Sequence, residues 1–356
     1  MKLENKVTTL LSGWNAAEEI PGLDNEGLAL DLQEQAKQKS LPIKILSIFG
    51  GLISSASFVG FLFMVGFFEN RSLYLPYSAL FLGLAILISL KFKHILLDTI
   101  CVSCLCVSYI LLLFSFEEMR LSGLWSSLLI FILSTLILWI MRNNILTFIL
   151  TLIICVSFFF FWKELGDFTL AQFFPPLLGI LLCGAYLQEG KIIAWRNHWS
   201  NRYHAIRSAL SFSYLGGLLY FTTTEQAEFM HPLNWVVSLL YMGLIGFVLA
   251  RVLQILKLEN KTLVIAIYLL TFASLAPTIF YPAIAGSLFL ILLSFMVNYR
   301  TGFVLGLASL IYAVSRFYYD LDYSLLTKSI MLMASGGLFL ILYFINRQKA
   351  PAHEKN

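Results

Sequence analysis

The stretch NILTFILTLIICVSFFFFW, residues 144–162, runs for nineteen residues without an Asp, Glu, Lys, Arg or His. A helix needs about 20 mostly apolar residues to cross the hydrocarbon core of a bilayer, so this stretch predicts a transmembrane helix. The whole chain of 356 residues is 59% hydrophobic and 12% charged, whereas soluble domains carry roughly 25% charged residues. This composition excludes a soluble globular protein and predicts an all-α, polytopic bundle of transmembrane helices.

Twelve stretches of the chain satisfy the same requirement for length and apolarity. They cover residues 43–68, 73–90, 94–116, 121–141, 144–162, 169–187, 206–223, 233–250, 262–277, 278–298, 301–318 and 325–345. The ninth and tenth are separated because 262–298 is too long for one helix and contains Pro277 and Pro282, which interrupt helical hydrogen bonding. We expect a tight turn between them.

The distribution of basic residues supports this count, because cytoplasmic loops of membrane proteins are enriched in Lys and Arg. With twelve spans and a cytoplasmic N-terminus, nineteen of the 24 Lys and Arg residues fall on the cytoplasmic side. The outer side receives Arg71, Arg120, Lys163, Arg316 and Lys328. We therefore expect a multi-pass protein of the inner (plasma) membrane with both termini in the cytoplasm.

This topology divides the chain into five segments. They are a cytoplasmic N-terminal segment with two short helices at 1–40, a first transmembrane half at 41–190, a cytoplasmic interfacial helix at 191–205, a second transmembrane half at 206–346 and a cytoplasmic tail at 347–356. The interfacial helix is expected because Trp195, Trp199 and Tyr203 recur every four residues on one helical face. Two sets of six spans are compatible with a duplication, although no residue-level repeat supports it.

Several classes of function lack support in the sequence. The net charge of +4 is spread between apolar runs, which argues against a nucleic-acid partner. All five cysteines lie inside apolar runs and are interpreted as buried small hydrophobes. Nucleotide-binding and common hydrolase motifs are missing from the sequence, so we expect a protein that is not an enzyme and that uses the lipid bilayer as its environment, without a cofactor or metal.

Asp98 is the first candidate for a functional site, because an unpaired charge in hydrocarbon costs roughly 3 kcal/mol or more. It lies about one turn inside the third predicted span, four residues after His94, and these two share a helix face with Cys101 one turn deeper. One interpretation is an ion or proton site formed by Asp98 and His94. The other is an ion pair of Asp98 with His94, Lys91 or Lys93 at the cytoplasmic edge.

A second candidate is RFYYDLDYSLLTKS, residues 316–329, at the outer junction of the last two spans. The residues proposed to bind a ligand or partner there are Arg316, Tyr319, Asp320, Asp322 and Lys328. Arg316 and Asp320 are four residues apart and can pair on a helix end. The competing interpretation is an interfacial belt of tyrosines with ion pairs that stabilise a tight helical hairpin.

The stretch FYYDLDYSLLTKSIMLMASGGLFLILYF (317–344) resembles the closing segment of a group of bacterial membrane proteins, the domain of unknown function 4401 family. The residues LPIKILSIFGGLISSASFVGFLFMVGFF (41–68) are similar to the first span of that family. The resemblance implies a multi-pass inner-membrane protein of uncharacterised activity. It also implies an association with a single-pass membrane protein of the GDYXXLXY-motif family.

Two functions follow from this sequence evidence. The first is a non-enzymatic scaffold or receptor that binds an envelope partner or ligand at its outer face, through the hairpin at 316–329. The second is a secondary transporter of a small solute, which twelve spans and a basic central loop also fit.

Overall fold

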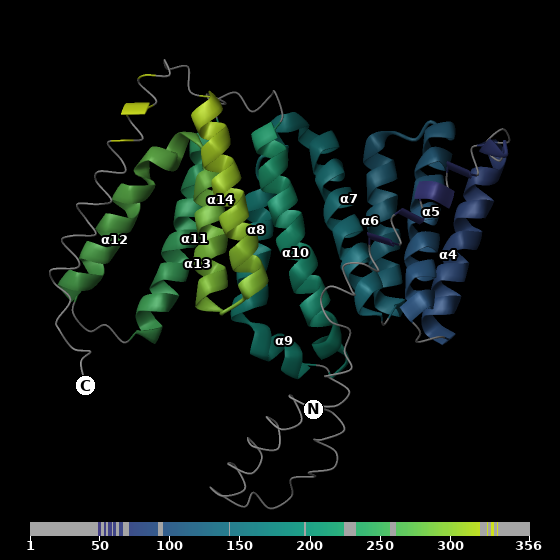
Figure 1. The fold of residues 1–356 in the computed structure, drawn as a ribbon, viewed down its shortest axis with the longest axis horizontal. Coiled ribbons are helices and arrows are strands. Elements are labelled where there is room, and N and C mark those ends of the chain that lie inside the picture. Colours follow the sequence, from purple (N-terminus) through teal and green to yellow (C-terminus); the bar gives the residue numbers. More distant parts are fainter. Residues whose placement is uncertain are drawn as a thin grey trace, which may run out of the picture.

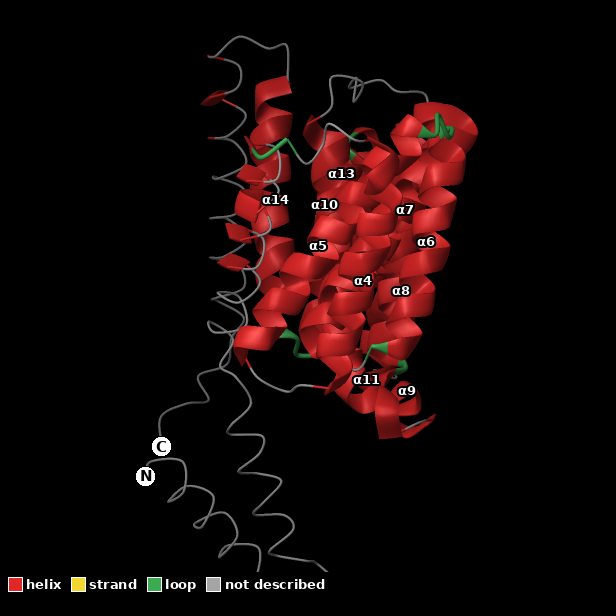
Figure 2. Ribbon diagram, turned by 90° about the vertical axis from the view of Figure 1, so that its right-hand side faces the viewer, coloured by secondary structure: helices red, strands yellow, loops and turns green. Residues whose placement is uncertain are grey.

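The computed structural model of the chain describes residues 71–91, 95–141, 143–195, 197–223, 233–256 and 261–320, together with single positions between 49 and 66 and between 326 and 333. The predicted N-terminal segment 1–40, the tail 347–356 and most of the predicted first and last spans lie outside the described residues. All regular elements in the described part are helices (Figure 2). The prediction of an all-α fold is confirmed for these residues.

The described helices follow one another through short connections. In chain order they are η1 (Arg71–Leu73), α4 (Tyr74–Lys91), α5 (Ile95–Glu118), α6 (Gly123–Ile140), α7 (Asn144–Ala171), α8 (Phe174–Leu187), α9 (Glu189–Trp195), α10 (Asn197–Thr223), α11 (Asn234–Ile255), α12 (Lys261–Leu275), η2 (Ala276–Phe280), α13 (Pro282–Met296) and α14 (Arg300–Asp320). Figure 1 shows the long helices standing side by side, with α9 at one end of the bundle.

Six of the described helices are long and apolar enough to cross a membrane. These candidate spans are Arg71–Lys91, Ile100–Glu118, Gly123–Ile140, Asn144–Gly166, Asn234–Ile255 and Arg300–Tyr319. Three shorter apolar helices accompany them, at Phe174–Leu187, Val264–Leu275 and Pro282–Met296. Many large apolar side chains on these helices are exposed, for example Leu136 and Trp139 on α6, as expected of a surface that faces lipid.

Successive long helices run in alternating directions along the bundle (Figure 1), and contacts between helix ends identify its two ends. At one end, Arg71 before α4 forms an ion pair with Glu118 at the end of α5 (3.1 Å). At the other end, Arg202 near the start of α10 donates a hydrogen bond to the carbonyl of Leu138 near the end of α6 (3.2 Å). The end with Arg202 is called the basic end, and the helices α5, α7, α10, α12 and α14 begin there. The end with Arg71 and Glu118 is called the opposite end.

Local sequence explains where several helices begin and turn. The Asn143 side chain caps α7 by accepting a hydrogen bond from the backbone N–H of Ile145 (3.0 Å). Pro282 opens α13 after the 3-10 helix η2, where a missing N–H is tolerated. The helix break predicted around Pro277 and Pro282 is therefore present. Asn298 adopts a positive φ of 54° between α13 and α14, a conformation that asparagine tolerates.

Two hydrophobic cores hold the bundle together. The first lies among α4, α5, α6 and α7 and includes Leu105 and Leu146. The second lies among α7, α8, α10, α11 and α13 and includes Tyr214 and Phe289. Helix α7 contributes to both cores and packs along α10, so it joins the two parts of the bundle.

The predicted interfacial helix at 191–205 corresponds to two elements of the structure. Its first residues belong to α9, and from Asn197 onward they belong to α10, which continues to Thr223. Tyr203 is buried and donates a hydrogen bond to the carbonyl of Ala185 in α8 (2.8 Å). This part of the predicted segment is thus packed against the bundle.

Candidate functional site

Asp98 lies in the first turn of α5 and is 7% exposed. One of its carboxylate oxygens, Oδ1, accepts a hydrogen bond from Nδ2 of Asn143 at 2.6 Å. The first turn of a helix also favours negative charge, because backbone N–H groups point toward it. The Asn143 amide and the start of α5 therefore hold the Asp98 carboxylate in place at the basic end of the first core.

The orientation of the Asn143 amide follows from its second hydrogen bond. Its oxygen caps α7 by accepting from Ile145, so its NH2 group is the one that faces Asp98. One side chain thus fixes the start of α7 and holds a carboxylate on α5. The sequence does not indicate that Asn143 is a partner of Asp98, because 45 residues separate the two.

The chemistry available at Asp98 is that of a fixed carboxylate, which can accept a proton or bind a cation. Cys101, which the sequence places on the same face, is 1% exposed in the structure. His94 lies outside the described residues, so the predicted Asp98–His94 site stays a prediction. Among the residues described, there is no group of three or more His, Cys, Asp or Glu side chains that could hold a metal ion.

The second candidate site lies at the opposite end, where α14 terminates. Phe317 packs edge-on against Tyr281, with ring centroids 5.4 Å apart, and Ala313 is buried beside them. Arg316 is exposed, and Tyr319 is exposed over 79% of its surface. The last turns of α14 are therefore anchored on one face and present Arg316 and Tyr319 on another.

Other members of this predicted site are described less fully. Asp320 is the last residue of α14, and its side chain lies outside the described part, as do Asp322 and Lys328 as whole residues. The structure places Arg316, Tyr319 and the backbone of Asp320 at one helix end. The predicted Arg316–Asp320 pair and the contribution of Asp322 and Lys328 stay predictions.

A third polar cluster, around Arg207 at the basic end, was not singled out from the sequence. The Arg207 side chain is 11% exposed, and its Nη1 lies 3.1 Å from Oε2 of Glu189. Its guanidinium carbon lies 4.2 Å from the ring centroid of Tyr299, 5.2 Å from that of Tyr203 and 5.7 Å from that of Tyr186. Cation–π contacts and an ion pair together compensate the buried charge.

Hydrogen bonds fix the tyrosines around Arg207. The Tyr186 hydroxyl bonds to Ser211 (2.8 Å), and the Tyr299 hydroxyl bonds to Ser208 (2.9 Å). Burial, with the carboxylate of Glu189 as a second cause, raises the pKa of Tyr203. These contacts connect α8, α9, α10 and the turn before α14. The cluster has the properties of a structural clamp, because its charges are paired and its tyrosine hydroxyls are hydrogen-bonded, although Nε of Arg207 is buried without a hydrogen bond to any described residue.

The sequence contained a weak signal for this cluster. Tyr203 and Arg207 are four residues apart, as on one face of a helix. Tyr186 and Glu189 lie fewer than 20 residues before Tyr203 in the chain. Near the cytoplasmic end of a span, however, a basic residue is expected to be solvated, and nothing in the spacing indicates the turn before α14 that carries Tyr299.

The fold and these sites define the class of the protein: a helical bundle with several helices of transmembrane length, a buried carboxylate, and charged residues at its two ends. Within this class, the chain belongs to the DUF4401 family, described as a domain of unknown function, which matches residues 40–349. The family expected from the two terminal segments is confirmed. No curated protein and no solved structure matches the chain.

Proposed function

We propose that the protein is a non-enzymatic membrane component that binds an envelope partner or ligand at the opposite end of the bundle. The observation that supports this most is the end of α14, where Phe317 is packed on Tyr281 while Tyr319 remains 79% exposed. An exposed aromatic residue on an anchored helix end suits binding, because little conformational entropy is lost when such a surface is covered.

The proposal includes a topology of twelve spans with both termini in the cytoplasm. The alternating directions of the described helices support it, as does the charge of the two ends. Among the described residues, the basic end carries Lys91, Lys191, Arg202, Arg207, Arg251, Lys261 and Arg300, with Asp98 and Glu189 as its acidic residues. The opposite end carries Arg71, Arg120, Lys163 and Arg316 with Glu117, Glu118, Glu164, Asp167 and Asp320.

By the positive-inside rule, the basic end faces the cytoplasm and the end of α14 faces outward. A single-pass membrane protein of the GDYXXLXY-motif family is the partner we propose, in the inner membrane of a bacterium. The association that the resemblance to this family implies is the reason for this choice, and the outward end of α14 is the surface that we assign to the partner.

A capture experiment tests this function. The tagged chain is co-expressed with the single-pass partner, solubilised in mild detergent and purified. Tyr319→Ala and Asp320→Asn are compared with Tyr312→Ala, which changes another exposed tyrosine of α14 two turns deeper. Loss of a buried interfacial tyrosine costs about 2 kcal/mol, or roughly 30-fold in affinity. Unchanged capture by the variants at position 319 or 320, at normal protein levels, contradicts the proposal.

A secondary transporter of a small solute is the second candidate, and the buried Asp98 is the observation that favours it. A carboxylate held inside a helical bundle is the kind of group that couples transport to a proton or sodium gradient. In proteoliposomes, gradient-driven uptake that is lost in Asp98→Asn and retained in Asp98→Glu supports the transporter. Stable partner capture without any flux supports the scaffold.

A further inference from the structure

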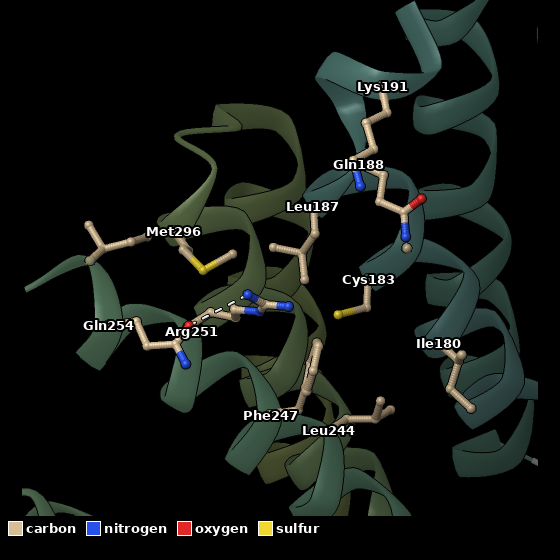
Figure 3. A pocket seen from close by; sticks show the side chains of 12 residues that line it. Ile180, Cys183, Leu187, Gln188, Lys191, Leu244, Phe247, Arg251, Gln254 and Met296 are labelled. Atoms are coloured by element: carbon tan, nitrogen blue, oxygen red, sulfur yellow. Dashed lines mark hydrogen bonds between the residues drawn. The ribbon is translucent and has the colours of Figure 1, made fainter. Parts of the chain in front are cut away.

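A pocket of about 770 Å³ lies between α8 and α11 near the basic end. The residues that line it are Ile180, Cys183, Gly184, Leu187, Gln188, Lys191, Leu244, Phe247, Arg251, Gln254, Ile255 and Met296. Figure 3 shows the Arg251 side chain reaching into the space between the two helices, toward Cys183 and Leu187. The volume is within the range of ligand-binding pockets, roughly 300–1,000 Å³.

The chemistry of the pocket changes along the helices. Ile180, Leu244 and Phe247 form an apolar part, in which Ile180 is 54% and Phe247 47% exposed. Toward the end of the bundle, Arg251 and Lys191 follow, with the amides of Gln188 and Gln254 beside them (Figure 3). None of the twelve lining residues is acidic. A pocket with basic side chains at one end and an exposed apolar surface beside them is complementary to an anionic amphiphile.

Arg251 is the basic residue of the pocket that lies within a candidate span, and its side chain is exposed. It lies inside the candidate span Asn234–Ile255, four residues before its end, where a cation without an anion is costly. The hydrogen bond found for its guanidinium within the described part of the chain is a long one, 3.5 Å from Nη1 to Oε1 of Gln254. Its guanidinium carbon also lies 5.5 Å from the ring centroid of Phe247. An arginine has five N–H donors, so this environment leaves capacity for an anionic group.

We propose that this pocket binds an anionic phospholipid, with the phosphate at Arg251 and Lys191 and the acyl chains along Ile180, Leu244 and Phe247. The phosphate supplies the negative charge and the oxygen acceptors that a guanidinium binds well. The exposed apolar wall keeps the acyl chains continuous with the bilayer. Basic pockets between transmembrane helices are typical sites for anionic lipid headgroups. This site is separate from the end of α14 and does not depend on partner binding there.

Native mass spectrometry of the delipidated, full-length protein tests the proposal. Phosphatidylglycerol and phosphatidylcholine with identical acyl chains are titrated in parallel, and one tightly bound phosphatidylglycerol is expected. Each basic side chain near an anionic lipid contributes a factor of about five in affinity. Lys191→Gln and Arg251→Gln should each weaken phosphatidylglycerol binding about fivefold, and the double variant roughly 30-fold. Lys91→Gln, an exposed basic residue on α4, is the matched control and should bind as the wild type does.

A second pair of variants changes the shape of the pocket and not its charge. A Cβ atom added at Gly184, which lines the pocket, meets no atom within 4 Å, and the same holds for Gly243 on α11, outside the pocket lining. Gly184→Phe fills the pocket and should abolish the tight site, while Gly243→Phe should leave it intact. If Arg251→Gln does not fold, Arg251→Lys replaces it and should keep the preference for phosphatidylglycerol.

Three results overturn the proposal. Equal affinity for the two lipids in the wild type shows that the charges do not select the headgroup. An unchanged preference in the double variant or in Gly184→Phe places lipid binding elsewhere. Displacement of bound phosphatidylglycerol by inorganic phosphate alone shows that the pocket is a site for free anions.

Discussion

Replacing Asn143 by alanine removes two hydrogen bonds, of which one caps α7 locally and the other joins α7 to α5 in the first core. One is the cap of α7, from the N–H of Ile145 to the Asn143 oxygen, and the other runs from its NH2 group to Asp98 at 2.6 Å. Loss of an N-cap costs about 1 kcal/mol, and loss of a hydrogen bond to a charged group costs roughly 1.5–3 kcal/mol. The expected decrease in the free energy of unfolding is about 3 kcal/mol.

The assay is unfolding of the purified protein in mixed micelles, followed by loss of helical circular dichroism. Asn143→Ser separates the two contributions, because serine keeps a capping oxygen but does not carry the amide that reaches Asp98. We expect it to lose about 2 kcal/mol, the part that belongs to the charged hydrogen bond. Asn144→Ala, at an exposed neighbouring position, is the control and should cost less than about 0.5 kcal/mol. If Asn143→Ala is as stable as Asn144→Ala, the assigned role of Asn143 is wrong.

Three further predictions concern the packing and the orientation of the bundle. A Cβ added at Gly306 lies 3.0 Å from the backbone nitrogen of Ile291. Gly306→Leu should therefore push α14 away from α13 and lower the free energy of unfolding by about 1–3 kcal/mol. Unchanged thermal unfolding of this variant refutes the close approach of the two helices. Arg207→Lys keeps the charge but loses the planar contacts with three tyrosines, so it should cost about 1–2 kcal/mol in the same unfolding assay; a neutral effect argues against the clamp. A reporter that is active only outside the cytoplasm should be active when fused at Glu117 and inactive when fused at Asn197. Activity of the fusion at Asn197 rejects the topology.

The positions of the described helices were largely predictable, because long apolar runs and the lack of charge determine them. The predicted stretch 144–162, for example, lies within α7, and the break at Pro282 lies where proline removes a backbone donor. The extent of α10 was less predictable. Its first turns are polar and contain Arg202, which the sequence assigned to a separate interfacial helix. Tertiary contacts with Leu138 and Ala185 keep these turns in the bundle.

The candidate sites were predictable only in part, because their key contacts join residues far apart in the chain. Asp98 was recognised by its depth in an apolar stretch, but its partner Asn143 was not, since a cap residue has no signature that points to a distant carboxylate. The packing of Phe317 on Tyr281, which anchors the end of α14, joins two helices in the same way. The cluster around Arg207 was not predictable, because its tyrosine partners come from three separate segments of the chain.

Site-specific photo-crosslinking in intact membranes tests the central proposal, that the end of α14 binds an envelope partner. A photoreactive phenylalanine derivative replaces Tyr319 in cells that co-express the single-pass partner. The same derivative at Ile255, an exposed residue at the basic end, is the control. The account predicts a discrete protein adduct from position 319 and none from position 255. No discrete adduct from position 319, or the same adduct from both positions, contradicts it.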